Sequence, residues 1–163
     1  TVRARPCGGK RQAERTVSTY SKTYVITGTT PAAASTAVVG AITGDLSYFD
    51  AIAVKASLAG ATGGTLDVYL QTSSDDGTTW DDYAHYTQIA GSAAATVTRN
   101  CFSRSTQATT PIAIGSGLSP ALAANAFVGG EFGDRMRCVC VAGVGTSAGA
   151  AITIRISGTR VGI

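Results

Sequence analysis

The sequence predicts an all-β protein: an antiparallel β-sandwich of about eight strands, jelly-roll-like in arrangement, with an extended N-terminal arm. Three observations favour this class. Hydrophobic residues make up 44% of the 163 residues and are mostly Ala, Val and Ile, which with abundant Ser and Thr suit strands. The 20 glycines recur between short alternating runs, as turns do in sandwiches. Helical and strand-like segments do not alternate, which argues against a parallel sheet.

The chain divides into an arm, residues 1–22, and a sandwich domain, residues 23–163. Pro6, Gly8 and Gly9 interrupt the arm, which has no apolar period. Six of its residues are basic and one is acidic, a net charge of +5, whereas the rest of the chain carries −2. No apolar run resembles a secretory signal or reaches the length of a membrane span. The residues expected to bind a partner are Arg3, Arg5, Lys10, Arg11 and Arg15.

The first half of the domain predicts three strands. Residues 24–27 and 37–42 are short candidates, each followed by a turn-prone segment. Residues 49–58 are the clearest strand, because their apolar residues are spaced by two and therefore share one face. These residues are Ile52, Val54, Ala56 and Leu58.

A hairpin is predicted between residues 66–71 and 80–89, because Asp-Gly separates two alternating runs. The spacing Ser-x-Asp-x-Gly-x-Thr-Trp in the turn resembles the Asp-box of sialidases and other β-proteins. The resemblance implies a structural turn, in which side chains bond the turn backbone, the glycine takes a positive φ and the tryptophan packs beneath. The residues in these positions are Ser73, Asp75, Gly77, Thr79 and Trp80.

The second half predicts strands at residues 95–104, 135–144 and 150–160, joined by a long irregular segment, residues 105–130. We expect one helical turn near residues 120–126, since Ala and Leu favour a helix and Pro suits its first turn. With these strands the domain reaches about eight.

The four cysteines do not predict a metal site. Cys138 and Cys140 share one face of an expected strand, no spacing suits zinc, and the chain has one histidine. We expect buried free thiols that pack as small hydrophobic groups. The alternative is a disulfide from Cys7 to Cys101 or to another subunit. Neither a metal nor any other cofactor is expected.

No constellation predicts catalysis, so we expect that the chain is not an enzyme. His85 is the one candidate base, and with Tyr83 and Thr87 we place it on a polar face of the sheet. The carboxylates at 75–76 and 81–82 lie on one hairpin tip, where we expect them to cap the tip's own amides. A glycosidase pair across a cleft and a calcium site fit this arrangement less well.

The basic arm has three interpretations: docking onto an acidic surface of neighbouring subunits, a solvated tail, or contact with nucleic-acid phosphates. Aromatic residues are absent before Tyr20, so base stacking has no support. Charged residues make up only 14% of the chain, which favours a surface covered by neighbours. Docking is therefore the expectation, and nucleic acid is not an expected partner.

Residues 64–88 resemble a stretch found in small structural proteins of tailed bacteriophages, and residues 135–144 and 150–160 are similar in style to the ends of those proteins. The resemblance implies a capsid decoration (cement) protein, which binds outside the shell at joints between major capsid subunits and reinforces it. It also implies the partners: the major capsid protein and neighbouring copies of the chain, as a dimer or trimer. The location would be the capsid surface of a virion assembled in the host cytoplasm.

Two alternatives remain open. A neck or tail-tube subunit would form rings and use residues 105–130 as a long insertion loop. A carbohydrate-binding sandwich would use Trp80, Tyr83 and Tyr86 as a platform for sugars, which requires these rings to be exposed.

Overall fold

The structure is a computed structural model that describes residues 19–29, 34–42, 44–58, 63–90, 96–104, 113–128, 130–145 and 151–161. Within these residues the chain forms nine strands and no helix. The strands are β1 (Thr19–Thr29), β2 (Thr36–Ala41), β3 (Ala51–Leu58), β4 (Thr65–Ser73), β5 (Asp81–His85), β6 (Ile89–Ala90), β7 (Thr96–Ser103), β8 (Arg135–Ala142) and β9 (Ala151–Val161). No helix in the described parts of the chain has the length and hydrophobicity that crossing a membrane requires.

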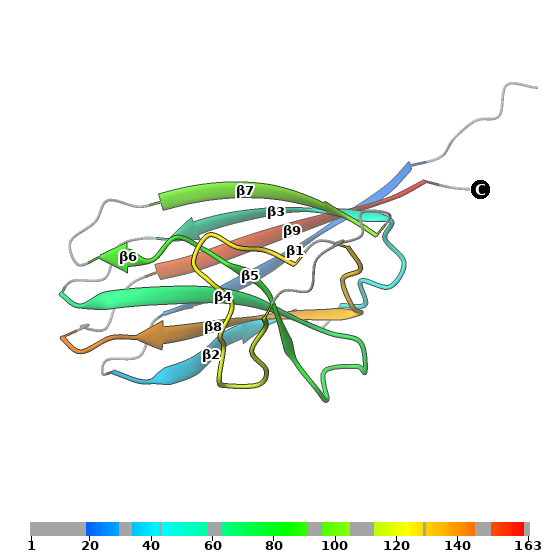
Figure 1. Ribbon diagram of the computed structural model, residues 1–163. Coiled ribbons are helices and arrows are strands. Elements are labelled where there is room, and N and C mark those ends of the chain that lie inside the picture. Colours follow the sequence, from blue (N-terminus) through cyan, green and yellow to red (C-terminus); the bar gives the residue numbers. More distant parts are fainter. Residues whose placement is uncertain are drawn as a thin grey trace, which may run out of the picture.

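Two antiparallel sheets pack face to face (Figure 1). The first has the strand order β1-β9-β3-β7 and the second the order β2-β8-β4-β5. β6 also pairs with β4, beyond the part that pairs with β5, so the two short strands occupy one strand position. Apart from the β4–β5 hairpin and the β5–β6 break, each connection crosses to the other sheet, which is the order of a jelly roll. The β-sandwich predicted from the sequence is confirmed.

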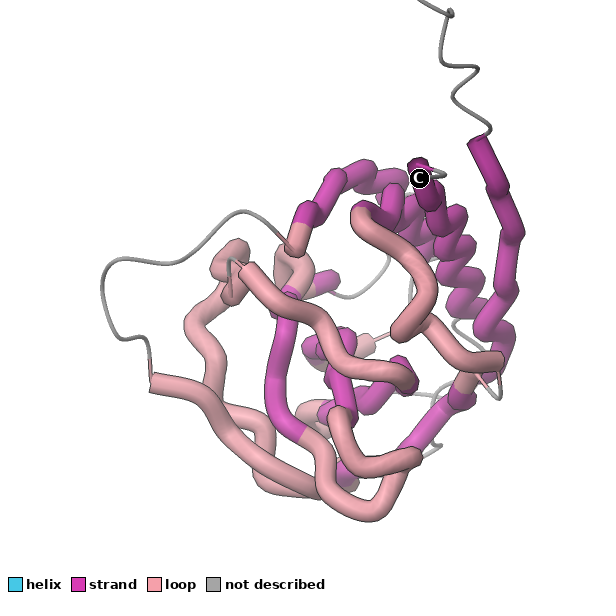
Figure 2. Tube along the Cα trace, turned by 90° about the vertical axis from the view of Figure 1, so that its right-hand side faces the viewer, coloured by secondary structure: helices cyan, strands magenta, loops and turns pink. Residues whose placement is uncertain are grey.

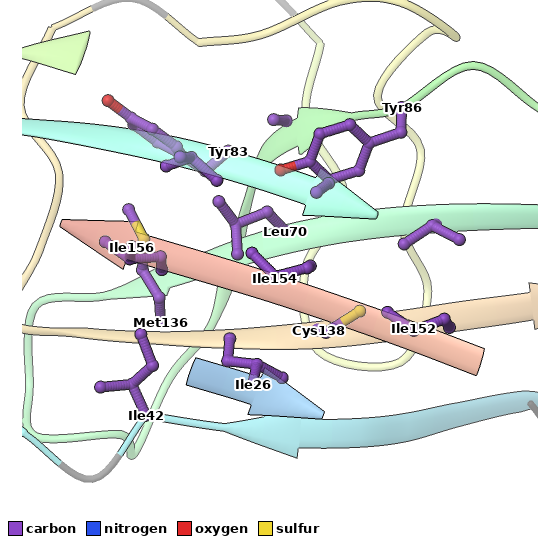
Figure 3. Close-up of a cluster of buried hydrophobic side chains, with 14 of the residues drawn as sticks. Ile26, Ile42, Leu70, Tyr83, Tyr86, Met136, Cys138, Ile152, Ile154 and Ile156 are labelled. Carbon is purple, nitrogen blue, oxygen red and sulfur yellow. The ribbon is translucent and has the colours of Figure 1, made fainter. Parts of the chain in front are cut away.

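The core lies between the sheets, where alternate residues of the strands meet (Figure 3). On β9, Ile152, Ile154 and Ile156 are buried against Leu70 of β4 and its neighbours. The four apolar residues assigned to one face of β3 are likewise all buried. A period of two in the sequence thus gives each sheet one apolar face, and the two apolar faces make the core.

Three features of the secondary structure differ from the predictions. β1 begins at Thr19, so the last residues assigned to the arm belong to the sheet. The helical turn expected near residues 120–126 is wrong, because that segment is an irregular loop that follows the edge of β5. The strand predicted at 80–89 is broken after His85, where the chain leaves β4 before rejoining it as β6.

Two cysteines are part of the core. Cys138 and Cys140 are buried on the inner face of β8 as free thiols, as expected. A hydrogen bond to the Cys138 thiol, together with burial, raises the pKa of the Cys140 thiol, so Cys140 stays neutral. Both side chains pack in the core as small apolar groups. Cys101 is a free, exposed cysteine on β7. Cys7, its possible partner in the disulfide alternative, lies outside the described residues.

Candidate functional site

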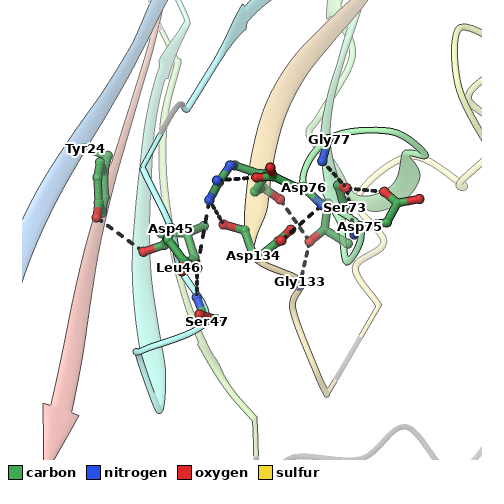
Figure 4. A network of polar contacts seen from close by, with 12 residues as sticks. Tyr24, Asp45, Leu46, Ser47, Ser73, Asp75, Asp76, Gly77, Gly133 and Asp134 are labelled. Atoms are coloured by element: carbon green, nitrogen blue, oxygen red, sulfur yellow. Dashed lines mark hydrogen bonds and ion pairs between the residues drawn. The ribbon is translucent and has the colours of Figure 1, made fainter.

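The turn between β4 and β5 is held by its own side chains (Figure 4). The Asp75 carboxylate accepts the Ser73 hydroxyl at 2.8 Å, the Thr79 N–H at 2.7 Å and the Thr79 hydroxyl at 2.7 Å. The Gly77 N–H donates to the Ser73 Oγ at 2.9 Å, and the φ of +88° at Gly77 suits glycine. Trp80 Nε1–H donates to the Gly77 carbonyl at 2.8 Å. All five positions of the Ser-x-Asp-x-Gly-x-Thr-Trp spacing thus take part in hydrogen bonds within the turn.

These bonds also tune the acid. The Thr79 N–H and then the Thr79 and Ser73 hydroxyls hold the pKa of Asp75 down, from its ordinary 3.8 to about 2. The carboxylate is therefore charged at neutral pH and accepts the hydrogen bonds that stabilise the turn.

The loops around this turn form an acidic end of the sandwich, the end that faces the viewer in Figure 2. Arg135 pairs with Asp76 and lies 3.9 Å from Asp45, and Arg104 lies 3.6 Å from Glu131. Lys22 and Arg160 line a hollow with Asp45, so this end carries six carboxylates and four cations. The six carboxylates of the acidic end are Asp45, Asp50, Asp75, Asp76, Glu131 and Asp134.

The prediction that all four hairpin carboxylates cap the turn is wrong for Asp82, which binds backbone amides outside the turn. Its side chain is 1% exposed, and its Oδ2 accepts the N–H groups of Gly115, Ala121 and Leu122 at 2.7–3.0 Å. Its Oδ1 accepts Gln71 Nε2–H at 2.9 Å. Asp82 therefore anchors a distant segment, residues 113–128, which we call the covering loop.

The covering loop closes the second sheet from outside. Leu122 packs on Tyr69 of β4 and Val139 of β8, two residues that point away from the core. Backbone hydrogen bonds also tie the loop to β5, from His85 N–H to the Ala126 carbonyl at 2.9 Å and from Val128 N–H to the Tyr83 carbonyl at 2.8 Å. The outer face of β4–β8 and the edge of β5 are thus covered by the chain itself.

His85 points to the outer face of the second sheet beside Asp67, where the covering loop buries it. Its ring stacks on Tyr69 with centroids 3.9 Å apart, and its Nδ1 donates to the Leu122 carbonyl at 2.7 Å. Its Nε2 lies 3.1 Å from Asp67 Oδ1. These contacts of His85 hold the covering loop against the sheet, so the histidine stabilises the structure.

The sugar platform expected from the alternative function is also wrong. Tyr83 and Tyr86 are buried in the core, and Trp80 is half-buried under its turn with Arg137 above its ring at 4.6 Å. A β-bulge explains the error: β5 has one extra residue, Tyr83, between the positions that pair with Leu70 and Gln71. The bulge turns Tyr83 inward, although His85, two residues on, points outward.

The outer face of the first sheet has no such cover from any described segment. Its side chains are small and polar or methyl-bearing, apart from two cations near its centre. We call this surface the open face. Its central residues are Thr23, Val25, Thr27, Ala53, Lys55, Ser57, Thr153, Arg155 and Ser157, all exposed or half-buried.

The two cations lie side by side. Lys55 of β3 and Arg155 of β9 are direct cross-strand partners, and the backbone register puts position 99, an arginine, opposite Lys55 on β7. Lys55, Arg155, Ala53 and Ser157 line a shallow hollow of about 230 Å³.

A second hollow, of about 450 Å³, lies where β1 begins. Tyr20 stacks on Phe49 with centroids 6.2 Å apart, and Lys22 lies 4.9 Å above the ring of Tyr24. The exposed ring of Tyr48 completes an aromatic rim beside Arg160.

The remaining predicted site residues are not placed by the structure. The five arm residues, Arg3, Arg5, Lys10, Arg11 and Arg15, lie outside the described residues. In the part of the chain that is described, no three His, Cys, Asp or Glu side chains gather as metal ligands would.

Comparison with known proteins gives only distant likenesses. No family model and no curated protein matches the chain. A structure from work on disulfide-linked pili, the Bacillus endospore appendages, has a TM-score of 0.45 and 12% identity over 98% of this chain and 99% of that one. Desmodium yellow mottle tymovirus scores 0.35 at 10% identity over 100% and 92%. Infectious bursal disease virus strain Gx scores 0.34 at 11% over 98% and 41%. These values are too low to carry an argument about relationship or function.

Proposed function

We propose that the chain is a structural subunit that neighbouring proteins hold through its open face. The observation that carries the proposal is the contrast between the two outer faces. The second sheet is closed by Leu122 and the rest of the covering loop, whereas no described segment lies over the first sheet. A sheet face of this size is available to another protein.

The composition of the open face suits such contact. Ser, Thr and Ala side chains lose little rotamer freedom when a partner covers them, and their small size permits close approach of the two surfaces. An exposed ion pair contributes only about 0–1 kcal/mol, so two cations alone do not hold a partner. Tight attachment would come from the whole face, repeated over many copies in an assembly.

The finer form of the proposal is a capsid decoration protein of a tailed bacteriophage. The chain would bind outside the shell at joints between major capsid subunits and reinforce it, without any catalytic step. Support comes from the phage-like stretch at residues 64–88. That stretch builds β4, the turn and β5, which join the sandwich to the covering loop.

A neck or tail-tube subunit is the weaker choice. That function needs a long insertion loop, which we assigned to residues 105–130. Of these, 113–128 are the covering loop, bound to β5 and β8 of the same chain. The binding of this loop within its own subunit leaves less of the segment to reach a neighbour.

The proposal is tested by counting copies of the chain in purified virus particles by quantitative mass spectrometry. We expect hundreds of copies per particle, accessible to an antibody on intact capsids. A count of about six or twelve would instead indicate a symmetric ring at the neck or tail. Absence of the chain from particles would overturn the proposal.

The arm has its own test, a chain without residues 1–15. Because β1 begins at Thr19, the truncated chain keeps every described strand. We expect it to fold with unchanged thermal stability and to occupy capsids at reduced level. Undiminished occupancy would remove the arm from the mechanism.

A further inference from the structure

The row of cations on the open face is unfavourable in an isolated chain. Lys55 of β3 and Arg155 of β9 are directly opposite each other on neighbouring strands. Like charges placed directly opposite each other in a sheet repel and are destabilising. Within the described residues, no ion pair involves Lys55 or Arg155.

No acidic side chain in the adjacent rows of β1, β9 and β3 neutralises the positive charge of Lys55 and Arg155. On β1, β9 and β3 the adjacent rows carry Thr, Ser and Ala, and Arg155 faces Val25 on β1. One of these rows continues to the exposed Cys101 on β7. Small side chains at Ala53 and Ser157 leave the hollow beside the two cations. Ser157 Oγ lies 3.0 Å from Thr23 Oγ1, so its hydroxyl is already paired. The hollow therefore offers positive charge and room to an incoming anionic group.

The same chain presents such groups at the acidic end. The side chains of Asp76 and Glu131 are 75% and 80% exposed, although each contacts an arginine. The turn that carries Asp76 extends β4 and β5 of the second sheet, at the end of the sandwich (Figure 1). The open face belongs to the first sheet, so we take the two surfaces to meet between different copies.

We propose that the Lys55–Arg155 row binds the acidic end of a second copy of the chain. The contact joins two different surfaces and is therefore heterologous, so it builds a ring or an open array. This inference rests on the proposed structural function and names one of the partners of the open face. Electrostatic attraction would orient the two copies and weaken as salt screens it.

The test measures self-association of the full chain by analytical ultracentrifugation at low and high salt. We expect the chain to self-associate, with an association constant that falls as salt is added. The double reversal Lys55→Glu/Arg155→Glu should lower that association constant by about tenfold or more. The matched control, Lys22→Glu/Arg160→Glu, reverses two cations outside the row that line a hollow with Asp45, and because it makes the acidic end more negative it should not weaken association. Circular dichroism checks that each variant is folded.

A charge swap makes the test specific. A second variant, Asp76→Lys/Glu131→Lys, should also fail to self-associate, whereas an equimolar mixture of the two reversed variants should associate again. The inference would be overturned if the mixture failed to associate, or if the Lys55→Glu/Arg155→Glu variant self-associated as strongly as the unmodified chain. Duplex DNA binding that depends on these residues, without self-association, would also overturn it and assign the row to phosphates.

The outcomes separate this inference from the proposed function. If particles carry hundreds of copies but the reversals leave association unchanged, the structural function stands and the contact is wrong. If the charge swap restores association but particles lack the chain, the contact stands and the virion function is wrong.

Discussion

The Asp82 carboxylate accepts the Leu122 backbone N–H at 3.0 Å, although the two residues are 40 positions apart. Two further loop amides and the Gln71 side chain bind the same carboxylate. One buried acid thus organises the loop that closes the second sheet. The difference between the two outer faces, on which the proposed function depends, begins with this residue.

Replacing Asp82 with Ala should therefore release the covering loop. The change leaves buried N–H donors without an acceptor, and each such donor costs about 1–3 kcal/mol. We expect a loss of about 2–4 kcal/mol in the free energy of unfolding, measured by urea denaturation, and faster hydrogen exchange at Gly115, Ala121 and Leu122. The exposed neighbour gives the control: Asp81→Ala should change stability by less than about 0.5 kcal/mol. Equal effects at the two positions would contradict the assignment.

The turn between β4 and β5 should be stable to unusually low pH. Because folding lowers the pKa of Asp75 to about 2, the charged carboxylate stabilises the turn fully above its ordinary pKa of 3.8. That contribution declines below pH 3.8 and is lost as the pH falls through about 2. Fluorescence of Trp80, the one tryptophan of the chain, reports the change.

The control for this titration is Asp75→Asn, which should abolish the fluorescence step. Thr79→Val removes one hydroxyl donor and should move the midpoint upward from about 2 towards 3.8. A wild-type midpoint at 3.8 or above would show that the turn does not bind the carboxylate as described.

Gly158 on β9 should resist replacement by Ala. A Cβ atom there would lie 2.3 Å from Cγ of Phe49, a buried ring that stacks on Tyr20 and meets the edge of Tyr24. We expect Gly158→Ala to reduce the free energy of unfolding by about 1–3 kcal/mol, through displacement of this ring. In a Phe49→Leu background the same change should cost less. Additive costs in the double-mutant cycle would argue against the contact.

The cysteines should differ sharply in reactivity. Cys101 is exposed, whereas Cys138 and Cys140 are buried and the pKa of the Cys140 thiol is raised. A water-soluble maleimide should modify Cys101 in the native chain, and the two buried thiols only on unfolding, as mapped by peptide mass spectrometry. Rapid native labelling of Cys138 or Cys140 contradicts their burial. Cys101 labelling that requires a reductant favours the disulfide alternative.

Most of the core could be predicted from local pattern. The period of two along β3 and β9 assigns each residue to a face without knowledge of the partner strand, and the structure confirms it. The Asp-Gly turn between β4 and β5 is likewise a local signal, because its bonds span at most four residues.

The covering loop could not be predicted in this way. Asp81 and Asp82 are identical neighbours in the sequence, yet one is exposed and the other binds a segment more than 30 residues away. The bulge at Tyr83 also puts Tyr83 and His85, which were expected to share one face, on opposite faces of the sheet. Both features depend on long-range contacts, and a period of two carries no information about them.

The most direct test of the account is lysine labelling of the chain within the assembly that contains it. An amine-reactive reagent is applied to intact particles and to the dissociated chain, and modification of Lys55 and Lys22 is measured by peptide mass spectrometry. Both lysines are exposed in the isolated chain, and only Lys55 is central to the open face. We expect Lys55 to be protected in particles by about tenfold or more relative to the dissociated chain, well beyond any protection of Lys22. Equal labelling of Lys55 in particles and in the dissociated chain would contradict the claim that neighbours cover this face.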